Sequence, residues 1–475
     1  MESGLSSLSG KNGLRNPLLI IGFFIAVYCL GMGLLVTFIH THYLSTHDLA
    51  IFEQSFWMTI HQGGFFTNTV DTMYHCSFGA HNSPILLALV PFYLIFQHPL
   101  LFYYISTLLL GLAAIPLFYI CKSLFDNRLS FLLVLIYLLS PAIHGINLYN
   151  FSVVCFVPLL FFSCWYGLIS NRWKLYLISG LTLILVREDV ALLPGMIGVY
   201  GLFFSKNRGG IFKITHLILI IFALLFTILS ITVVIPYFAS SSSLSSNYIQ
   251  NFVDNFTPYG KQRVVLFAET FLPLLFIPFA APEILLVGMF QFLEVFLSPA
   301  FSFLDIQYHY PGMFQPVIIL ATVYGLLKIS RFLQVKDREF LFKYIQILLF
   351  SSSIISFLII SPFISYSMVV PDYLDQAHKD KYQYLDSIIA HIPGNAAIVT
   401  QDNVIPHLAG RIEAFQYGYH PDADYVIIET GTGYAKYFEP DLKKYQGWIP
   451  LIKKNEIVVL SNPRKPYLQE YLLGL

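Results

Sequence analysis

Long apolar runs separated by short polar islands make up the chain from residue 17 to about residue 366. An α-helix rises about 1.5 Å per residue, so about 20 apolar residues cross a hydrocarbon core about 30 Å thick. The pattern predicts an all-α polytopic membrane domain over residues 17–366 with about eleven transmembrane helices. These runs lie at 17–39, 100–121, 129–141, 153–170, 173–187, 190–204, 211–235, 263–279, 282–298, 311–329 and 341–363.

The apolar stretch 84–97 is too short for length alone to place it. At about 14 residues it can cross the membrane, re-enter it or lie along its surface, so we use the basic residues, which concentrate in cytoplasmic loops. We expect a cytoplasmic N-terminal segment 1–16, an outer loop 40–99 containing 84–97, and residence in the plasma membrane. This model places the following residues inside: Lys122, Arg128, Arg172, Lys174, Lys206, Arg208, Lys213, Lys328, Arg331, Lys336, Arg338 and Lys343.

The chain changes character after Pro371, where apolar residues thin out and charged residues become frequent. Short β-type runs occur at 397–399, 425–428 and 457–460, and residues 380–391 have helical spacing before a Pro-Gly pair. Strands that alternate with a helix are typical of an α/β fold. We therefore expect residues 371–475 to form a small α/β domain outside the membrane.

Composition agrees with a membrane protein and excludes nucleic-acid binding. Of the 475 residues, 56% are hydrophobic and 11% are charged, which is more apolar surface than one water-soluble core hides. The 27 basic and 27 acidic residues give a formal net charge of +0, with no basic stretch for a nucleic acid. The five cysteines form no C-x-x-C pair and indicate neither a disulfide framework nor a metal site.

The outer loop 40–99 carries an acidic residue close to the end of the first span. Asp48 is either a solvated carboxylate that caps a helix starting at Leu49 or an acid that faces a cavity at the membrane surface. His47, Asp71 and His75 lie in the same loop and are weak candidates for ligands of a divalent metal ion. Nothing in the sequence makes a cofactor certain, because no two of these residues share a helix face at ligand spacing.

Three consecutive ionisable residues, Arg187, Glu188 and Asp189, interrupt an apolar stretch. Each charge in mid-bilayer costs roughly 2.5–3.5 kcal/mol, so the cluster forms a turn at the surface or lines a polar cavity. The cluster has no Gly, Asn or Pro of the kind that usually makes a tight turn, which favours the cavity. Tyr308 and His309, at the start of a late span, are either interfacial anchors or contacts for a phosphate or sugar.

At these residues the chain resembles a family of prokaryotic predicted membrane proteins of unknown function. The resemblance covers nearly the whole chain and is carried by D-L-x-x-F-x-Q at 48–54, H-x-S-P at 81–84, E-D-V-A-L at 188–192 and H-Y at 309–310. It departs at 149–153, where Tyr-Asn-Phe-Ser-Val stands in place of an F-x-F-H-P-like stretch.

That family in turn resembles, more distantly, the C-type (GT-C) membrane glycosyltransferases, which take a sugar from a polyprenyl-phosphate carrier. The resemblance implies a GT-C-like fold, a catalytic acid in the first outer loop and a carrier phosphate docked beside it. Asp48 occupies the place of that acid, and membrane lipids and a polyprenyl-phosphate sugar become the implied partners. The residues that would form the phosphate and substrate site are His81, Arg187, Glu188, Asp189, Tyr308 and His309.

Two other functions stay open at this point: a transporter or flippase with a gated polar site at 187–189, and a non-catalytic scaffold whose outer domain binds a partner. An interrupted helix at 187–189 fits a transporter, but the sequence shows no matching interruption in a second half. The enzymatic hypothesis makes one structural demand, which is that Asp48 and the Arg187–Asp189 bend share a single hydrated pocket that opens to the outer leaflet.

Overall fold

A computed structural model describes residues 17–204, 209–239, 259–335 and 338–465. The segment 1–16, predicted to be cytoplasmic, lies outside the described residues, as do Lys206, Arg208 and Lys336. The helices of the membrane domain are α1 (Pro17–Thr41), α2 (His47–His61), α3 (Ser77–Ala80), α4 (Val90–Ile95), α5 (Leu100–Leu112), α6 (Ala114–Lys122), α7 (Asn127–Leu138), α8 (Pro141–Leu148), α9 (Phe156–Ile169), α10 (Trp173–Ile184), α11 (Leu192–Phe203), α12 (Gly210–Leu229), α13 (Ile235–Phe238), α15 (Gly260–Phe271), α16 (Pro282–Leu285), α17 (Met289–Leu297), α18 (Gln315–Val335), α19 (Glu339–Ile360) and α20 (Pro362–Tyr373).

Five helical segments of the described chain are long and apolar enough to cross a membrane, or six if the bent pair α7–α8 is one span. Each predicted apolar run is helical for most of its length, but several are shorter than the hydrocarbon core requires. The described shorter helices include α10 and α11, with 12 residues each. The structure therefore confirms a polytopic helical membrane domain and does not confirm the predicted number of eleven spans.

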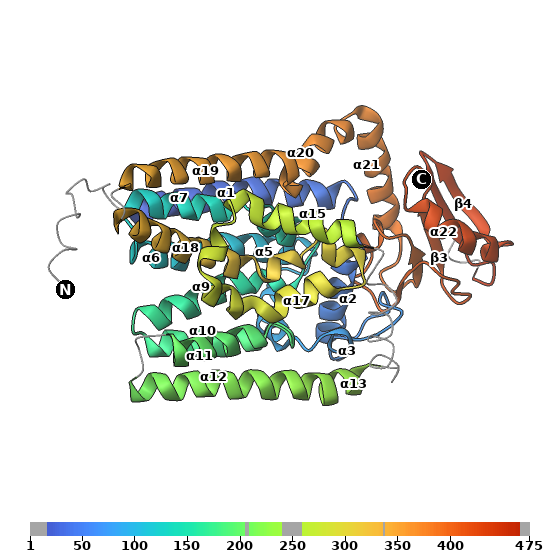
Figure 1. The fold of residues 1–475 in the computed structure, drawn as a ribbon. Coiled ribbons are helices and arrows are strands. Elements are labelled where there is room, and N and C mark those ends of the chain that lie inside the picture. Colours follow the sequence, from blue (N-terminus) through green and yellow to red (C-terminus); the bar gives the residue numbers. More distant parts are fainter. Residues whose placement is uncertain (1–16, 205–208, 240–258, 336–337, 466–475) are drawn as a thin grey trace.

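Prolines break the predicted run 263–279 into short pieces. Leu275 and Phe276 adopt left-handed backbone conformations, with φ of 53° and 56°, between Pro273 and Pro278. A proline ring has no N–H for the helix ladder, so two such residues five positions apart end α15 and prevent a straight continuation. This part of the chain folds back on itself instead of crossing as one rod (Figure 1).

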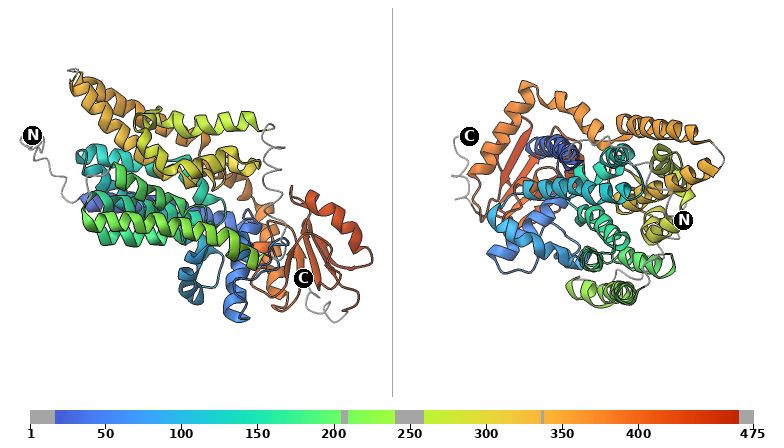
Figure 2. Two further views of the ribbon diagram at one scale, coloured as in Figure 1. Left: turned by 60° about the horizontal axis from the view of Figure 1, so that its bottom comes forward. Right: turned by 90° about the vertical axis from the view of Figure 1, so that its left-hand side faces the viewer.

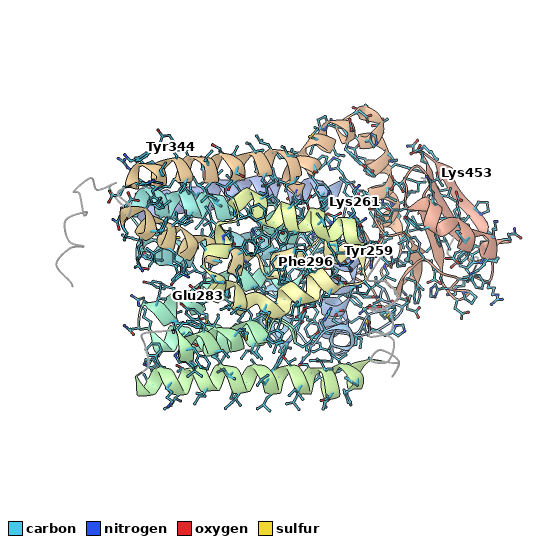
Figure 3. All side chains as sticks on the ribbon, viewed as in Figure 1. Tyr259, Lys261, Glu283, Phe296, Tyr344 and Lys453 are labelled. Atoms are coloured by element: carbon cyan, nitrogen blue, oxygen red, sulfur yellow. The ribbon has the colours of Figure 1, made fainter. Side chains whose placement is uncertain are left out.

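The long helices run side by side, and α1 begins at the end of this bundle that lies opposite the C-terminal domain (Figure 1). Views from other sides show the same separation, with the C-terminal sheet beyond one end of the helices (Figure 2). Apolar side chains on the outside of α12 and α19 stay exposed, for example Ile221, Phe222 and Ile359. Tyr344 on α19 also points away from the bundle (Figure 3). Such a surface fits contact with lipid tails.

The C-terminal domain is a five-stranded sheet with the order β2-β1-β3-β5-β4. Strands β1 (Ile398–Thr400), β2 (Ala414–Gln416) and β3 (Tyr425–Glu429) are parallel, whereas β4 (Ile449–Lys454) and β5 (Ile457–Ser461) form an antiparallel hairpin beside β3. Helix α21 (Gln376–His391) contributes Leu385 to the core on one face, and α22 (Ala435–Leu442) contributes Phe438 to the core on the other. The three predicted β-type runs and the predicted helix are all present.

Two predictions for the outer loops need correction or refinement. The stretch 142–152, which the apolar pattern leaves as an outer loop between the predicted spans 129–141 and 153–170, is mostly the helix α8, which is buried along its length and contains His144. The stretch 84–97 forms the short helices η1 (Pro84–Leu89) and α4, which together are too short to cross the membrane as one helix and lie near α2. Helices α2, α3 and α4 lie at the same end of the bundle as the C-terminal domain (Figure 1).

Candidate functional site at the end of the helical domain near the C-terminal sheet

Asp48 lies in the first turn of α2, where the partial positive charge of the helix N-terminus favours a carboxylate. The residue at the N-cap is Thr46, not Asp48, so the simple capping explanation for Asp48 is wrong. Asn150 fixes this helix start, because its side-chain oxygen accepts from the Thr46 backbone N–H at 2.8 Å and its amide donates to the Thr46 hydroxyl at 2.6 Å. Asn150 itself has φ +47°, a conformation that Asn tolerates better than most residues.

Two side chains contact the Asp48 carboxylate. The Nε2 atom of His47 lies 3.3 Å from Asp48 Oδ1, and the Tyr149 hydroxyl is within hydrogen-bonding reach of the same carboxylate. Burial and the nearby negative charge raise the pKa of Tyr149, so its phenol keeps its proton and acts as a donor. The Asp48 side chain stays 30% exposed, which leaves room for a third hydrogen-bonding partner.

His47 also joins the C-terminal domain to α2. Asp402, in the turn after β1, accepts from the His47 backbone N–H and contacts the ring Nδ1, both at 2.8 Å. Burial lowers the pKa of His47, but the hydrogen bond with Asp402 and the charges of Asp48, Asp402 and Asp71 outweigh it and raise this pKa to about 9. At neutral pH, His47 is therefore a cation held between two carboxylates.

The bend 187–189 is a network of ionised pairs. Arg187, which is almost fully buried, forms a two-pronged ion pair with Asp189. Burial alone raises the pKa of Asp189, but the adjacent guanidinium outweighs it and holds this pKa well below its usual range. Glu188 accepts from the backbone N–H of Asn82 at 2.9 Å and contacts Nδ1 of His81 at 2.7 Å. The bend is thus neither a plain turn nor a free cationic site.

Glu294 of α17 adds a third carboxyl group to this network. It shares a hydrogen bond with the Asp189 carboxylate. Two carboxyl groups can share a hydrogen bond only if one of them holds a proton, and Asp189 is already ionised by its pairing with Arg187. Glu294 is therefore the protonated partner, which keeps the buried cluster from accumulating negative charge.

His309 connects the two halves of the site. Its ring centroid is 5.6 Å from that of Tyr149, whose ring also packs against Tyr308 at 4.5 Å. Burial lowers the pKa of His309 well below its usual range, and the charges of Arg187 and His81 act in the same direction. A neutral His309 therefore lies between the Asp48 side and the Arg187 side, and within the described chain its Nδ1 has no hydrogen-bond partner.

The structure brings Asp48 and the Arg187–Asp189 bend to the same end of the helical domain and links them through a chain of side chains, whereas one hydrated pocket shared by both stays a prediction. Asp48 contacts Tyr149, Tyr149 packs on Tyr308 and His309, and His309 feels the charges of Arg187, Asp189 and His81. The site lies at the end of the helical domain that faces the C-terminal sheet.

The candidate metal ligands of the loop do not gather around one point. Asp71 accepts from the backbone N–H groups of Met73 and Tyr74 and so stabilises its own turn, whereas His47 is bonded to Asp402. In the described parts of the chain, no group of three or more His, Cys, Asp or Glu residues is arranged to hold a metal ion.

Four residues of the site were not predicted from the sequence: Tyr149, Asn150, Glu294 and Asp402. Tyr149 and Asn150 follow α8, and the sequence singles them out only as part of the stretch 149–153, where the family resemblance departs. Asp402 lies 355 residues from its partner His47, so no local pattern links the two. Glu294 carried a signal that was overlooked, since an acidic residue within the apolar run 282–298 is costly in a membrane unless it is paired or protonated.

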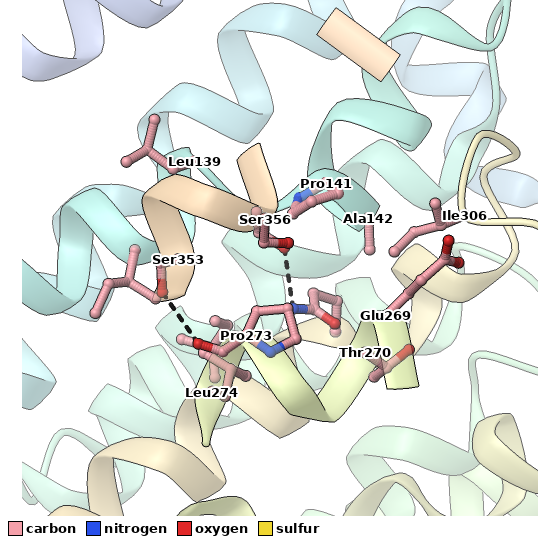
Figure 4. Close-up of a pocket in the computed structure, with 14 residues that line it drawn as sticks. Leu139, Pro141, Ala142, Glu269, Thr270, Pro273, Leu274, Ile306, Ser353 and Ser356 are labelled. Atoms are coloured by element: carbon pink, nitrogen blue, oxygen red, sulfur yellow. Dashed lines mark hydrogen bonds between the residues drawn. The ribbon is translucent and has the colours of Figure 1, made fainter. Parts of the chain in front are cut away.

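Two cavities are lined in part by residues that shortly precede Tyr308. An outer groove of about 350 Å³ is bounded by α15, by residues 301–307 and by the junction of α19 and α20, and Lys261, Glu269 and Ser365 are among the residues that line it. A smaller inner pocket of about 20 Å³ shares Glu269 and Ile306 with this groove. Glu269, Thr270 and Ser356 point into the inner pocket (Figure 4).

A solved structure similar to this chain is the crystal structure of ArnT from Cupriavidus metallidurans bound to undecaprenyl phosphate. The match has a TM-score of 0.55 and 11% sequence identity, and it covers 93% of this chain and 98% of ArnT. A likeness at this identity shows the fold. The chain is therefore a polytopic membrane protein whose fold resembles that of a GT-C glycosyltransferase.

The particular family follows from the sequence. The model of the family described as "Predicted membrane protein (DUF2079)" matches residues 40–458, and the chain belongs to that family. Both resemblances drawn from the sequence motifs are thereby confirmed. A search of curated proteins finds no match to the chain.

Proposed function

We propose that the protein transfers a sugar from a polyprenyl-phosphate carrier to an acceptor hydroxyl on the outer face of the membrane. The observation that carries this proposal is the arrangement of Asp48, Tyr149 and His309, which places a partly exposed carboxylate next to a buried imidazole with an unused nitrogen. The GT-C-like fold supports the general class, and the carrier bound by ArnT has the chemistry that the proposal assigns to the donor.

In the proposed reaction Asp48 is the general base. It takes the proton of the acceptor hydroxyl while the acceptor oxygen forms a bond to the anomeric carbon and the bond from that carbon to the phosphate oxygen breaks. The electron pair of the broken bond leaves with the polyprenyl phosphate, and the configuration at the anomeric carbon inverts. The phosphate is already a good leaving group, so the protein needs a base and groups that receive the departing charge.

His81 and His309 are the groups proposed to meet the phosphate. The His81 side chain is 48% exposed and is held by Glu188, so it can contact a ligand without losing its partner. Arg187 stands behind these residues: its guanidinium is occupied by Asp189, and we assign it to the positive potential of the site rather than to direct contact with phosphate. Glu188 positions the His81 ring, and Asp189 positions the Arg187 guanidinium.

The outer groove is proposed to take the apolar chain of the carrier. Half of the twelve residues that line it are apolar, among them Val265, Phe301 and Ile359, and the lining includes Gln307, which directly precedes Tyr308. The headgroup then occupies the site and the isoprenoid chain occupies the groove.

The proposal also fixes an orientation. The end of the bundle with the C-terminal domain faces outside, which agrees with the basic residues Lys122 and Arg128 at the far ends of α6 and α7. A requirement for a divalent ion stays a prediction based on His47, Asp71 and His75, and chelation by EDTA during the transfer assay tests it.

The test uses the full-length protein in lipid nanodiscs with undecaprenyl-phosphate sugars and detects the transferred sugar by mass spectrometry. The variant Asp48→Asn keeps the shape of the side chain but removes the base, so transfer falls by about 10²- to 10⁴-fold. Asp126→Asn is the matched control, because it makes the same change at an acidic residue that caps α7 through the Leu129 N–H, and Asn caps a helix about as well as Asp. Transfer that survives Asp48→Asn unchanged contradicts the proposed base. Cargo that crosses liposomes without a covalent product favours a transporter instead.

A further inference from the structure

The C-terminal domain supplies a carboxylate to the helix that carries Asp48. Asp402 follows β1 directly, at the carboxyl end of the parallel strands of the sheet, where ligands and functional residues of α/β folds commonly lie. Its Oδ1 accepts three hydrogen bonds, from the backbone N–H and ring of His47 and from the Gln416 amide at 3.1 Å. Its own backbone N–H donates to the Tyr417 hydroxyl at 3.3 Å, so the acceptor is held from within its own domain.

The bond to the His47 backbone has a specific structural effect. The first N–H groups of an α-helix have no partner within the helix and need an acceptor from elsewhere. The Thr46 side chain makes no capping bond to α2, because its hydroxyl accepts from Asn150. Asp402 therefore acts as a capping carboxylate for α2, although it comes from a different domain. Its negative charge at the helix N-terminus is also favourable.

The bond to the His47 ring extends this effect to Asp48. With its Nδ1 proton directed at Asp402, the imidazolium presents its Nε2 proton toward Asp48, 3.3 Å away. The titratable groups that face His47 are Asp48, Asp402 and Asp71, all of which are acidic. One Asp48 oxygen is thus held by a charged donor whose own orientation is set by the C-terminal domain.

We infer that Asp402 is a positioning residue for the reaction proposed above, through which docking of the C-terminal domain fixes the start of α2 and the Asp48 carboxylate in working geometry. Asp402 does not touch the substrate in this scheme. The inference rests on the proposed function for its catalytic part, whereas the mechanical part, that Asp402 holds the start of α2, stands on the hydrogen bonds alone.

Two substitutions separate the mechanical and the electrostatic parts. Asp402→Ala removes the acceptor for the His47 N–H, so the first-turn amides of α2 exchange with deuterium faster and the kcat for sugar transfer falls by about tenfold or more, with the KM for the donor unchanged. Asp402→Asn keeps an oxygen acceptor but loses the charge. It leaves amide exchange near that of the wild type and moves the alkaline limb of the pH–rate profile from about pH 9 toward the ordinary imidazole value of about 6.5.

Asp424→Asn is the matched control. Asp424 also accepts a backbone N–H, that of Ala397 at 2.8 Å, but it precedes β3 and so lies at the opposite edge of the same sheet. It is expected to leave kcat, the pH profile and exchange in α2 unchanged. If Asp402→Ala does not fold, Asp402→Asn and His47→Gln carry the test, since both are expected to remove the limb near pH 9.

The outcomes distinguish this inference from the function on which it rests. A wild-type protein that transfers no sugar overturns the proposed function, and amide exchange in Asp402→Ala then decides whether the domain holds α2. An active wild type whose kcat, pH profile and α2 exchange are all unaffected by Asp402→Ala overturns the positioning role.

Discussion

His309 shows how one residue can be costly for stability and useful for a site. Its ring is buried among Tyr149, Tyr308 and Tyr310, which is favourable, but within the described chain its Nδ1 has no partner, which costs free energy of folding. A residue selected only for packing would be an aromatic ring without nitrogen. The unused nitrogen beside the Arg187–Asp189 network is available to the ligand that the proposed function assigns to this site.

His309→Phe tests this interpretation. Phenylalanine keeps the ring contacts with Tyr149 and removes the buried unpaired nitrogen, so we expect the thermal unfolding temperature to stay the same or to rise, by the equivalent of up to about 1 kcal/mol. Sugar transfer should fall at the same time by at least about tenfold, through loss of the contact with phosphate. Thermal unfolding in detergent and the transfer assay measure the two effects. Loss of stability together with activity would assign His309 a purely structural role.

At the residue scale, the sequence indicates which residues are candidates for a functional site, but it does not show which residues contact them. Asp48, His309 and the triplet at 187 were recognisable, because ionisable groups near a membrane are expensive and so mark a site. Their partners come from distant parts of the chain: Tyr149 lies about 100 residues from Asp48, and Asp402 lies 355 residues from His47. Such pairs depend on helix packing and domain docking, which have no local signal.

At the scale of helices, the lengths of the apolar runs predicted where along the chain the helices lie, but not where a helix breaks. The long segments α1 and α12 were recognisable from hydropathy alone, since nothing in their sequences interrupts the ladder early. The apolar run 263–279 predicts one span, but its prolines and the two left-handed residues between them break the helix. Hydropathy records burial in lipid and carries no information on backbone hydrogen bonds, so it does not predict the break, whose Pro273 and Leu274 line the inner pocket.

The outer groove allows a test of where the isoprenoid chain of the carrier binds. Ser365 of α20 lines it and is a small residue, so Ser365→Trp places a large ring in the space assigned to the isoprenoid chain. The KM for a long-chain polyprenyl donor is expected to rise by about tenfold, because packing of several methylene groups is lost, while the KM for a donor with a chain of about ten carbons stays the same. Transfer assays with the two donors measure the difference.

The matched control for this experiment is Ser367→Trp. Ser367 is two residues away on the same helix, does not line the groove and bonds only the Phe363 carbonyl. Equal effects of both substitutions, or an equal effect on both donors, would show that the groove does not hold the carrier chain.

At the scale of the whole molecule, the sequence predicted two parts and their fold classes but not their joint role. The alternation of buried residues in β3, with Tyr425 and Ile427 on one face and Val426 and Ile428 on the other, is what the short β-type run indicated. The docking of this domain was not predictable, because it depends on single contacts. One is Gln54, whose amide donates to the backbone carbonyls of Arg411 and Ile412 across the interface.

Acidification should weaken this docking, because a histidine lies buried in the interface. The His407 ring stacks on His40 at 4.2 Å and on Tyr43 at 4.0 Å, with His98 also close to His40. Burial lowers the pKa of His407 to about 3, and His98 acts in the same direction. An undocked His407 titrates near pH 6.5. The docked state therefore keeps its full stability above about pH 6.5 and loses at most about 1.4 kcal/mol for each pH unit below it, until the docked pKa is reached.

Hydrogen–deuterium exchange of peptides around η9 (Ile405–His407) measures this loss between pH 7.5 and pH 5, after correction for the intrinsic pH dependence of exchange. The wild type is expected to open more often as the pH falls, because protonation traps the undocked form. His407→Phe keeps a ring in the stack and cannot bind a proton, so its opening should depend less on pH, with only His40 and His98 still titrating. Identical pH dependence in the two proteins would show that His407 is not the group that couples acid to docking. If docking positions Asp48 through Asp402, sugar transfer must fall over the same pH range, and it must fall less in His407→Phe.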